Sequence, residues 1–512
     1  MKNAIGRELP EYIPGYGKVI PYQGLFIGER LKDRISMPSK LVKPGDNKLL
    51  SSLEEAIDVL DIRDGMTLSF HHHLRNGDFV LNMVIEKIAA KGIKDLTIAA
   101  SSIFPVHAPM VEHIRAGVVT KIYASYISGP VAEAISRGEL KKPVVMQTHG
   151  GRSRAIEEGE IAIDVAFLAA PSADCYGNIN GVVGPSACGA LGYAVADSMY
   201  GKQVVAITDN LVPYPASPIE ISQIYVDHVV KVDSIGDPQG IVSGTTKITR
   251  NPIGLKIARD AALVIEASGL FKEGMSFQTG AGGTSLAVAK ELKERMKENN
   301  IKGSFASGGI TGYLVDMLKD GLFESLLDVQ CFDIEAVFSY RDNPRHQGMS
   351  ASIYGNPHNK GAVVNKLDVV ILGATEIDID FNVNVTTGSD GRILGGSGGH
   401  SDTAAGAKLS IIVSNLMKAR LPIIKDKVIT ATTPGETVDV LVTERGVAVN
   451  PRRKDLQEKL EKAGVNLKSI EELKKIAESY TSIPKEITFD DKIVGVVEYR
   501  DGSVLDIIRR VD

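Results

Sequence analysis

The chain has 512 residues, of which 43% are apolar and 24% are charged, and its net charge is −5. This balance is typical of a soluble globular protein with material for roughly two to four domains. Its basic stretches are short and have acidic neighbours, so the sequence predicts no nucleic-acid partner. With only three cysteines and no stretch of about 18 uninterrupted apolar residues, we expect a cytoplasmic protein that neither is exported nor crosses a membrane.

The first half of the chain alternates strand-like and helix-like patterns. KDLTIAA, TKIYASYI and PVVMQT have the pattern of buried strands, and VEHIRAGV and VAEAISRG lie between them as helices. Strands that alternate with helices form βαβ units. We therefore expect a doubly wound, mostly parallel sheet in this half.

Three consecutive histidines follow a short apolar run in FHHHLRNGDF, at residues 70–79. Consecutive side chains of an extended segment point to opposite faces, so His71 and His73 can share one face while His72 takes the other. This geometry suits a metal poorly. Ligands of open α/β sheets gather at the carboxyl ends of strands, which favours a binding role. A polar strand end without chemistry is the alternative.

Several phrases of the first half recur in the second half in the same order. IRDGMTLSF is echoed by FKEGMSFQTGAGG, and their anchor glycines, Gly65 and Gly274, are 209 residues apart. DCYGNINGVVGPSACGA is echoed by GSDGRILGGSGGHSDTAAGA, where Gly177 and Gly391 are 214 residues apart. Insertions in loops explain the small drift. The repeats predict two homologous α/β halves, and the Pro- and Gly-bearing stretch 232–254 marks the boundary between them.

Two glycine-rich loops stand out in the second half. TGAGG at 279–283 leads into a helix, where successive N–H groups can approach an anion or a developing oxyanion without interference from a Cβ atom. The alternative is a tight turn. The stretch lacks the third glycine and the acidic residue of the dinucleotide fingerprint, and no P-loop pattern occurs, so neither nicotinamide nor P-loop nucleotide binding is predicted.

The second loop, GGSGG at 395–399, matches the G-x-S-x-G pattern of hydrolases. That fold needs a histidine later in the chain than its acid. Here the last histidine, His400, lies immediately beside the candidate Ser397. We therefore interpret the loop as a backbone cradle and not as a nucleophile elbow.

The C-terminal tail carries separate structural signals. Asn450 and Pro451 predict the start of a helix that ends near Gly464, and SIEE at 469–472 predicts a capping box for the next helix. After these, KIVGVVEYRDGSVLDIIRR predicts two strands paired through Asp501 and Gly502.

Several of these strings resemble the citrate lyase α-subunit family of the CoA-transferase superfamily. The more specific strings are HHHLRNGD and GGSGGHSD, whereas VTERG and QTGAGG resemble CoA-transferases generally. Further matches, from VSGTTKITRNPIGLKIA to the closing YRDGSVLDIIRRVD, extend the resemblance over nearly the whole chain. It implies two tandem homologous CoA-transferase-like α/β domains with mostly parallel sheets, which we place at 1–231 and 232–512, and an active site in the cleft between them.

The resemblance also implies a reaction and partners. Citrate displaces the acetyl group of a thioester on an acyl-carrier protein, giving acetate and a citryl thioester that a separate lyase subunit cleaves. The implied partners are citrate, the acyl-carrier (gamma) subunit and the citryl-lyase (beta) subunit, and we expect a homo-oligomer. We expect no metal or cofactor bound in this chain. The thioester belongs to a phosphopantetheine-type group of the carrier, for which acetyl-CoA is a surrogate.

One departure from other CoA-transferases bears on the mechanism. Members that form a covalent glutamyl thioester have a Glu just after the strand that follows the second-half Gly-rich helix. The similar stretch here, GSFASGGITGYLVDML at 303–318, has Gly308 at that place. We therefore expect a carboxylate of citrate to attack the thioester itself, in a ternary complex, and to form a mixed anhydride. A carboxylate is already ionised at neutral pH and needs no general base.

The site residues follow from this chemistry and from the resemblance. Citrate brings up to three negative charges, which require Arg and His donors, and each attack on a thioester creates an oxyanion that backbone N–H groups can hold. The backbone donors expected to act in catalysis are Gly282, Gly283, Gly398 and Gly399. The expected substrate-binding residues are His71, His72, His73, Arg75, Asn76, Gln278, Thr279, Gly280, Gly308, Gly309 and His400.

Two alternatives remain open at this point. A related CoA-transferase for citramalate or a short-chain acid would use the same scaffold. A non-catalytic ligand-sensing module would keep the sheets but would not need two Gly-rich loops and a polar cluster.

Overall fold

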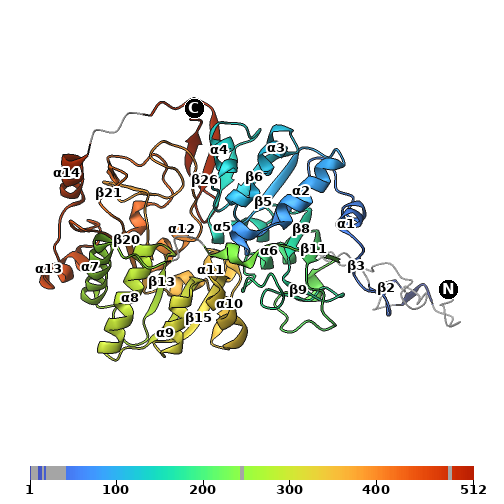
Figure 1. Ribbon diagram of the computed structural model, residues 1–512, viewed down its shortest axis with the longest axis horizontal. Coiled ribbons are helices and arrows are strands. Elements are labelled where there is room, and N and C mark those ends of the chain that lie inside the picture. Colours follow the sequence, from blue (N-terminus) through green and yellow to red (C-terminus); the bar gives the residue numbers. More distant parts are fainter. Residues whose placement is uncertain (2–9, 14–16, 19–41, 243–246, 482–486, 512) are drawn as a thin grey trace.

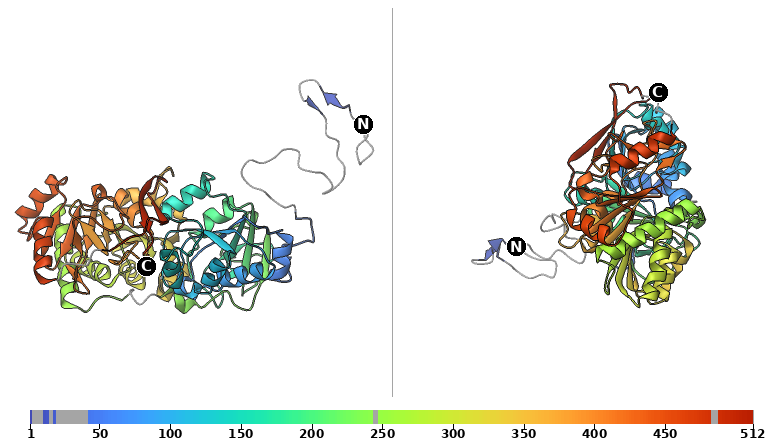
Figure 2. Two further views of the ribbon diagram at one scale, coloured as in Figure 1. Left: turned by 90° about the horizontal axis from the view of Figure 1, so that it is seen from above. Right: turned by 90° about the vertical axis from the view of Figure 1, so that its left-hand side faces the viewer.

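The computed structural model describes residues 1, 10–13, 17–18, 42–242, 247–481 and 487–511. Two open sheets with packed helices lie side by side, one in each half of the chain, and form an elongated body (Figures 1 and 2). The predicted α/β class with mostly parallel sheets is confirmed. Among the described residues, none of the helices has the length and apolar character that a membrane span requires.

The first sheet has ten strands in the order β27-β26-β7-β6-β5-β4-β8-β11-β12-β3. All neighbours pair in parallel except β26 and β27. The strands are β3 (Leu49–Leu50), β4 (Thr67–Phe70), β5 (Leu96–Ala100), β6 (Val119–Ala124), β7 (Val144–Met146), β8 (Val165–Ala169), β11 (Gln203–Thr208), β12 (His228–Lys231), β26 (Ile493–Glu498) and β27 (Val504–Arg509). The helices of this half are α1 (Leu53–Val59), α2 (Val80–Ala90), α3 (Met110–Arg115), α4 (Pro130–Ser136), α5 (His149–Glu157) and α6 (Ala194–Tyr200).

The second sheet has eight strands in the order β16-β15-β14-β13-β17-β20-β24-β25. Only β24 and β25 pair antiparallel. The strands are β13 (Ser276–Thr279), β14 (Gly303–Ile310), β15 (Phe323–Cys331), β16 (His346–Gly348), β17 (Val369–Leu372), β20 (Leu409–Val413), β24 (Val440–Thr443) and β25 (Gly446–Val449). The helices are α7 (Pro252–Ser268), α8 (Gly283–Glu298), α9 (Gly312–Lys319), α10 (Ile334–Asp342), α11 (Ala351–Gly355), α12 (His400–Gly406), α13 (Lys454–Lys462) and α14 (Ile470–Tyr480).

Short strands lie outside these two sheets. They are β1 (Tyr12–Ile13), β2 (Gly17–Lys18), β9 (Ser172–Ala173), β10 (Ile179–Asn180), β18 (Glu376–Asp378), β19 (Val383–Asn384), β21 (Met417–Lys418), β22 (Leu421–Pro422) and β23 (Ile424–Lys425).

The two sheets repeat one topology. The order β7-β6-β5-β4-β8-β11-β12 of the first sheet matches β16-β15-β14-β13-β17-β20-β24 of the second, strand for strand. The central strands β4 and β13 begin at Thr67 and Ser276, which are 209 residues apart, like the anchor glycines. The predicted internal repeat therefore corresponds to two copies of one fold.

Central strands are buried on both faces. Every residue of β5, β8, β17 and β20 is buried, and these strands consist mostly of Ala, Val, Ile and Leu. Continuous apolar runs of this kind are typical of parallel strands covered by helices on both sides.

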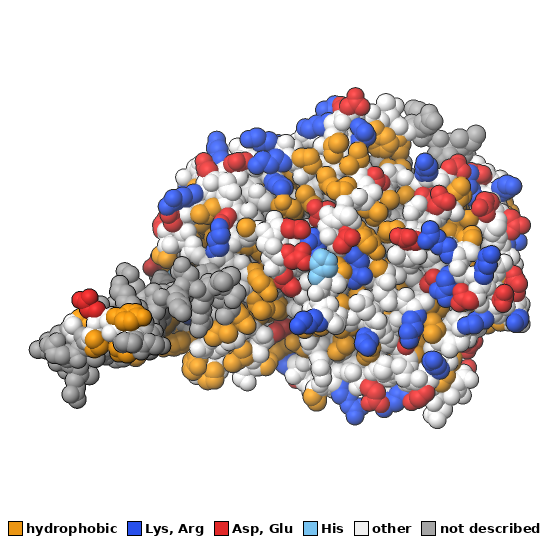
Figure 3. All heavy atoms as spheres, turned by 180° about the vertical axis from the view of Figure 1, so that it is seen from behind, with side chains coloured by type: hydrophobic (Ala, Val, Ile, Leu, Met, Phe, Trp, Pro, Cys, Tyr) orange, Lys and Arg blue, Asp and Glu red, His pale blue; other side chains and the backbone are white. Residues whose placement is uncertain are grey.

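On the face drawn in Figure 3, Lys and Arg are interspersed with Asp and Glu. That face has no stripe of a single charge.

The C-terminal hairpin joins the sheet of the other half. β26 pairs in parallel with β7, with Gly495 opposite Val144, and lies beside the first half in Figure 1. The predicted turn at Asp501 and Gly502 is confirmed. The division at residue 231 stays a prediction, and two strands of 232–512 complete the sheet of 1–231.

The two predicted tail helices differ in accuracy. The capping box of Ser469 and Glu472 at α14 is confirmed. The expected helix start at Pro451 is wrong, because α13 begins at Lys454. The side chain of Asn450 accepts a hydrogen bond from the Arg452 N–H at 3.1 Å, which forms a local turn before the helix.

Candidate active site

The carboxyl ends of both sheets meet where the two halves touch. His71, His72 and His73 follow β4 directly, and Gln330 lies near the end of β15 in the other half. The Gln330 side chain donates from Nε2 to the backbone oxygen of His72 at 2.9 Å. The ligand-binding edges of both sheets therefore contribute to one site, as expected for open α/β sheets.

The three histidines divide between two directions, as the sequence predicts. His71 and His73 contact each other through their Nδ1 atoms, and His71 Nε2 accepts a hydrogen bond from the Ala169 N–H at 2.9 Å. His72 turns elsewhere, with its Nδ1 2.5 Å from Ser101 Oγ. Its ring stacks on that of Tyr193 at a centroid distance of 4.5 Å. The cluster is thus a packed array of aromatic rings.

These imidazoles are neutral at pH 7. Burial lowers the pKa of His71 to about 4, and it lowers the pKa of His149, at the start of α5, to about 3. Burial also places the pKa values of His72 and His73 well below the ordinary value. Both ring nitrogens of His71 and of His73 already have partners, so only His72 and His149 keep a ring nitrogen for a ligand, and any positive charge must come from another residue.

Arg75 supplies a positive charge at this place. It has a positive φ of 52° in a short 3₁₀ turn after the histidines. Its guanidinium lies over the ring of Phe104, at 5.5 Å from the centroid, and over that of Phe332 of the second half, at 4.6 Å. Nη1 is buried and has no hydrogen-bond partner. Arg75 as a whole is half-buried, but a buried donor atom without a partner is costly, and an anion could satisfy it.

The second half contributes a packed glycine pair on β14. Gly308 has a φ of 106°, and a Cβ atom there would lie 2.8 Å from the side-chain carbon of the Gln278 amide. A Cβ atom on Gly309 would lie 2.3 Å from the ring of Phe332, the ring beneath Arg75. A glutamate therefore does not fit at position 308 without displacing its neighbours, and β14 itself carries no acidic residue.

The Gln278 amide links this strand to the surrounding helices. Its Nε2 donates to the Tyr354 hydroxyl at 2.8 Å, and its Oε1 accepts from the Ser307 hydroxyl at 3.1 Å. Gly399 lies against the same Tyr354 hydroxyl, which an added Cβ would approach to 2.2 Å. Gln278, Gly308 and Gly399 are therefore brought together.

The loop after Gln278 is more open. Thr279 is buried, whereas Gly282 is exposed, and a Cβ atom on Gly280 would meet no neighbour closer than 3.7 Å. Gly283 begins α8, and no side chain caps this N-terminus. The Gly280 N–H donates to the Ile371 oxygen at 3.0 Å, so the predicted anion-binding role stays a prediction for the N–H groups at the start of α8.

The second glycine-rich loop is an interface between the halves. The N–H groups of Gly395, Gly396 and Gly398 donate to backbone oxygens of Thr386, Val385 and Ser125, respectively. The Gly398 N–H is thus 3.0 Å from an oxygen of the first half and is not free to hold an oxyanion. This pairing argues against the cradle interpretation for Gly398. The loop instead places Gly398 against His149, whose Nε2 would be 3.3 Å from an added Cβ.

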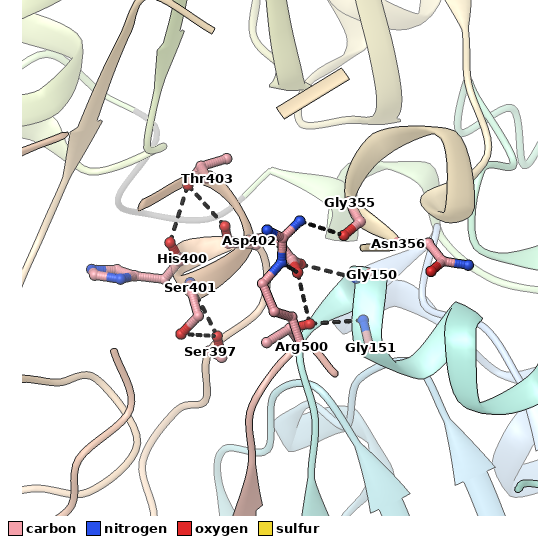
Figure 4. A network of polar contacts seen from close by, with 12 residues as sticks. Gly150, Gly151, Gly355, Asn356, Ser397, His400, Ser401, Asp402, Thr403 and Arg500 are labelled. Carbon is pink, nitrogen blue, oxygen red and sulfur yellow. Dashed lines mark hydrogen bonds and ion pairs between the residues drawn. The ribbon is translucent and has the colours of Figure 1, made fainter. Parts of the chain in front are cut away.

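Two predicted ligands point away from the cluster. Asn76 is exposed, and its Oδ1 accepts from the Val106 N–H at 3.0 Å. His400 is buried, with Nδ1 2.7 Å from Thr433 Oγ1 and Nε2 2.8 Å from the Gly373 oxygen. In Figure 4 its ring points away from Asp402 and Arg500. Both side chains have structural partners in place of a ligand.

Asp402 joins the halves and was missed by the sequence analysis. It accepts hydrogen bonds from the Thr148 hydroxyl at 2.8 Å and from the Gly150 N–H at 2.9 Å, at the N-terminus of α5 (Figure 4). Arg500 of the C-terminal hairpin lies 3.5 Å from the same carboxylate and donates to the Gly355 oxygen at 3.0 Å. Burial raises the pKa of Asp402 to about 6. This network fixes the helix that carries His149.

His149 and Tyr193 were also missed. The His149 ring packs against that of Tyr193 with centroids 4.6 Å apart and an interplanar angle of 49°, and its Nδ1 is buried without a hydrogen-bond partner. The only available signal was the position of His149 directly after the strand-like PVVMQT, at a carboxyl strand end. Tyr193 carries no comparable signal in the sequence.

One further cluster has the residue types of a metal site. Asp328, Cys331 and His346 are buried, with their ligand atoms within 4.8 Å of one another. They bond to each other, because Cys331 Sγ donates to Asp328 Oδ2 at 3.0 Å and His346 Nε2 lies 3.2 Å from the same oxygen. Burial raises the pKa of the Cys331 thiol, which disfavours the thiolate that a metal needs.

Comparison with known proteins identifies the family of the chain. Residues 46–511 match the family described as citrate lyase, alpha subunit (CitF). The chain is 52% identical to the citrate lyase alpha chain of Escherichia coli (strain K12), over 92% of both chains. It is 54% identical to that of Haemophilus influenzae, over 91% of this chain and 93% of the relative.

Solved structures show the same relationship. The alpha subunit of citrate lyase from Streptococcus mutans, crystallised in complex with citrate, is similar with a TM-score of 0.91, 50% identity and full coverage of both chains. A Pseudomonas malonate decarboxylase shares the fold, with a TM-score of 0.62 at 16% identity over 86% of this chain and 95% of the other. From the family match and the identities over nine-tenths of its length, the chain belongs to the citrate lyase alpha subunit family.

Proposed function

We propose that this chain exchanges acetyl for citryl on the thioester of an acyl-carrier protein, and that it does so in a ternary complex without an enzyme-bound thioester. As a citrate lyase alpha subunit, it is a citrate:acetyl-carrier-protein transferase, an enzyme of the CoA-transferase type. The observation that carries the ternary route is Gly308, which has no side chain and lies against the Gln278 amide, so that a glutamate there would have to displace Gln278.

The exchange takes two steps. A carboxylate oxygen of citrate attacks the carbonyl carbon of the acetyl thioester, and the carrier thiolate leaves as the mixed citryl–acetyl anhydride forms. The thiolate then attacks the citryl carbonyl, and acetate leaves. No external base is needed, because citrate enters ionised and the thiolate returns as the second nucleophile. The enzyme has to bind both partners, exclude water and hold the charge that develops.

Arg75 is the group best suited to the charge of citrate. Its guanidinium is positioned by Phe104 of one half and Phe332 of the other, and it keeps an unpartnered buried donor. The unpartnered Nδ1 of His149 adds a neutral hydrogen-bonding group. A guanidinium can form charge-assisted hydrogen bonds to a carboxylate, and a neutral imidazole can add an uncharged hydrogen bond to the same ligand. The Streptococcus mutans relative was solved in complex with citrate, which supports citrate as the ligand of this family member.

The second half is better suited to the thioester. Its Gly280–Gly283 loop leads into α8, whose N-terminal turn has no side-chain cap. Such a terminus stabilises a developing negative charge. Because the Gly280 N–H already donates to the Ile371 oxygen at 3.0 Å, we assign the oxyanion role to the N–H groups at the start of α8 and a positioning role to the loop that contains Gly398.

The family supports a set of partners. We infer that the acyl-carrier (gamma) and citryl-lyase (beta) subunits bind this chain, that it forms a homo-oligomer, and that the carrier thioester is attached to a phosphopantetheine-type group. The cysteines Cys175, Cys188 and Cys331 form no disulfide, which agrees with a cytoplasmic location.

The direct test uses purified chain, acetyl-carrier protein and citrate. Acetate release that requires citrate and yields citryl-carrier supports the proposal. Citramalate and succinate serve as comparison acids, because each has one carboxylate fewer than citrate. Acetate release at equal rates with all acids, or with none, contradicts the proposed substrate.

A further inference from the structure

A basic cavity lies beside the glycine loop of the second half. It has a volume of about 870 Å³ and is lined by Lys247, Ile248, Thr249, Arg250, Leu255, Lys290 and Tyr313. Three of these residues are cations and none is acidic. The cavity lies among the N-terminal residues of α7, the middle of α8 and the start of α9.

The three cations are exposed and have no ion-pair partner among the described residues. Lys247, Arg250 and Lys290 all have solvent-exposed side chains, and none takes part in a salt bridge. Neighbouring basic residues differ, because Lys293 and Lys297 both pair with Asp320 at 2.9 Å. These two lysines therefore neutralise Asp320, which lies on the Tyr313 side of the cavity. The cations on the other side remain available to an anionic ligand.

The wall of this cavity contacts the loop assigned to the thioester. The Thr249 N–H donates to the Gly283 oxygen at 3.1 Å, and a Cβ atom on Gly283 would lie 2.8 Å from the Lys247 oxygen. Gly283 is separated by only four residues from Gln278, which contacts Gly308. A ligand with its anionic part in the cavity can therefore extend along the Gly280–Gly283 loop toward the reacting carbonyl.

We propose that this cavity binds the phosphate groups of the arm that carries the thioester, with Lys247, Arg250 and Lys290 as the phosphate-binding residues. This inference rests on the proposed function, which requires a thioester on a phosphopantetheine-type group. Phosphate oxygens carry charge at neutral pH and bind Lys and Arg in charge-assisted hydrogen bonds. Anchoring the arm at its phosphates would orient the thioester at its far end.

The test compares two thioesters that differ in their phosphates. Acetyl-CoA carries phosphates, whereas acetyl-N-acetylcysteamine has the same reacting group without them. In Arg250→Glu/Lys290→Glu, we expect KM for acetyl-CoA to rise about tenfold or more, because two attractive contacts become repulsive. KM for citrate and kcat/KM for acetyl-N-acetylcysteamine should stay within twofold of the wild type, since neither involves the cavity.

Lys94→Glu is the matched control. Lys94 is exposed just before β5, at the amino end of the first sheet and away from the site. The substitution reverses one charge outside the cavity, so the kinetic constants for both thioesters should equal those of the wild type. An equal loss with both thioesters in the double variant, or no loss with either, overturns the proposal.

A second readout separates this inference from the proposed function. Calorimetric titration with CoA measures phosphate-dependent binding whether or not the chain turns over. Weaker CoA binding by the double variant, with an unchanged cooperative melt, supports the cavity even if citrate proves to be the wrong substrate. CoA binding equal to that of the wild type contradicts it even if citrate-dependent turnover is observed.

Discussion

Arg75 is a half-buried cation with one buried donor atom, Nη1, that has no hydrogen-bond partner, and we proposed it as a citrate-binding residue. We predict that Arg75→Ala raises KM for citrate. It should also lower kcat/KM for citrate by a factor that corresponds to about 2–4 kcal/mol of binding energy, because a charge-assisted contact shielded from water is lost. KM for the acetyl thioester should change little. Arg75→Lys should restore only part of the activity, because an ammonium lacks the planar fork that stacks on Phe104 and Phe332.

Steady-state kinetics with each substrate varied in turn checks this prediction. Arg63→Ala is the control, because its guanidinium pairs with Asp61 at the surface and is 71% exposed. Unchanged citrate kinetics in Arg75→Ala would remove Arg75 from the site.

His400 makes a different prediction, which concerns stability. Burial lowers its pKa from 6.5 to about 4, so the folded chain keeps it neutral while the unfolded chain takes up a proton below pH 6.5. The unfolded state binds more protons between these values, so the free energy of unfolding falls as the pH falls from 6.5 toward 4. His400 contributes a slope of about 1.4 kcal/mol per pH unit in this window.

His400→Gln should remove that slope, because its amide can still donate to the Gly373 oxygen but has no proton to gain. Urea unfolding at several pH values between 4.5 and 7 measures it. His358→Gln is the comparison, since that side chain is 53% exposed. A pH profile of His400→Gln that is parallel to the wild type would show that His400 does not titrate as described.

For single residues, the sequence predicts the local backbone geometry better than it predicts hydrogen-bond partners that are distant in the chain. The alternation of His71, His72 and His73 follows from an extended backbone and is confirmed. The partner of the Gly398 N–H is Ser125, 273 residues earlier in the chain, and no local pattern encodes it. The contact of Asn76 is of the same kind, because its Oδ1 accepts from the Val106 N–H, and its substrate-binding role stays a prediction.

The C-terminal hairpin of β26 and β27 is the element that ties the halves together. β26 adds to the edge of the first sheet, and Arg500 at its end reaches Asp402 and Gly355 of the second half. Removing one partner of a buried ion pair leaves the other charge uncompensated.

We predict that Arg500→Ala lowers the free energy of unfolding by roughly 3 kcal/mol at pH 7 and also reduces activity, because Asp402 positions the helix that begins at His149. Urea denaturation and acetate release measure the two effects. Arg509→Ala, which breaks an exposed ion pair with Asp491 on the same hairpin, should cost less than about 1 kcal/mol. Equal losses in the two variants would contradict the role of the Arg500 contact.

At the scale of elements, the sequence predicts the hairpin but not its place. Alternating apolar residues and the Asp501–Gly502 turn specify two paired strands. Which sheet edge they join depends on contacts with β7, about 350 residues away, and these have no local signal. The start of α13 was predicted at Pro451 for a related reason, because the sequence does not show that Asn450 is held by Gly435 and Val438.

The whole molecule consists of two copies of one sheet whose ligand-binding edges face a common site. The repeat was predictable because each copy keeps its phrases in order, and the topology follows from the βαβ rule. The contacts that make one site from two edges, such as Gln330 with His72 and Arg75 with Phe332, bring residues together from opposite halves. They arise from tertiary packing, so the sequence predicted the edges but not their pairing.

The proposed ternary route requires that no thioester or anhydride forms on the protein itself. Incubation of the chain with acetyl-carrier protein or acetyl-CoA, without citrate, followed by hydroxylamine or borohydride trapping and intact-mass measurement, tests it most directly. Because Gly308 offers no carboxylate and the Gln278 side chain lies where one would begin, we expect an unmodified mass, with acetate released only when citrate is added. A trapped acyl, thioester or reduced adduct on a glutamate of this chain, formed at the rate of turnover, would contradict it.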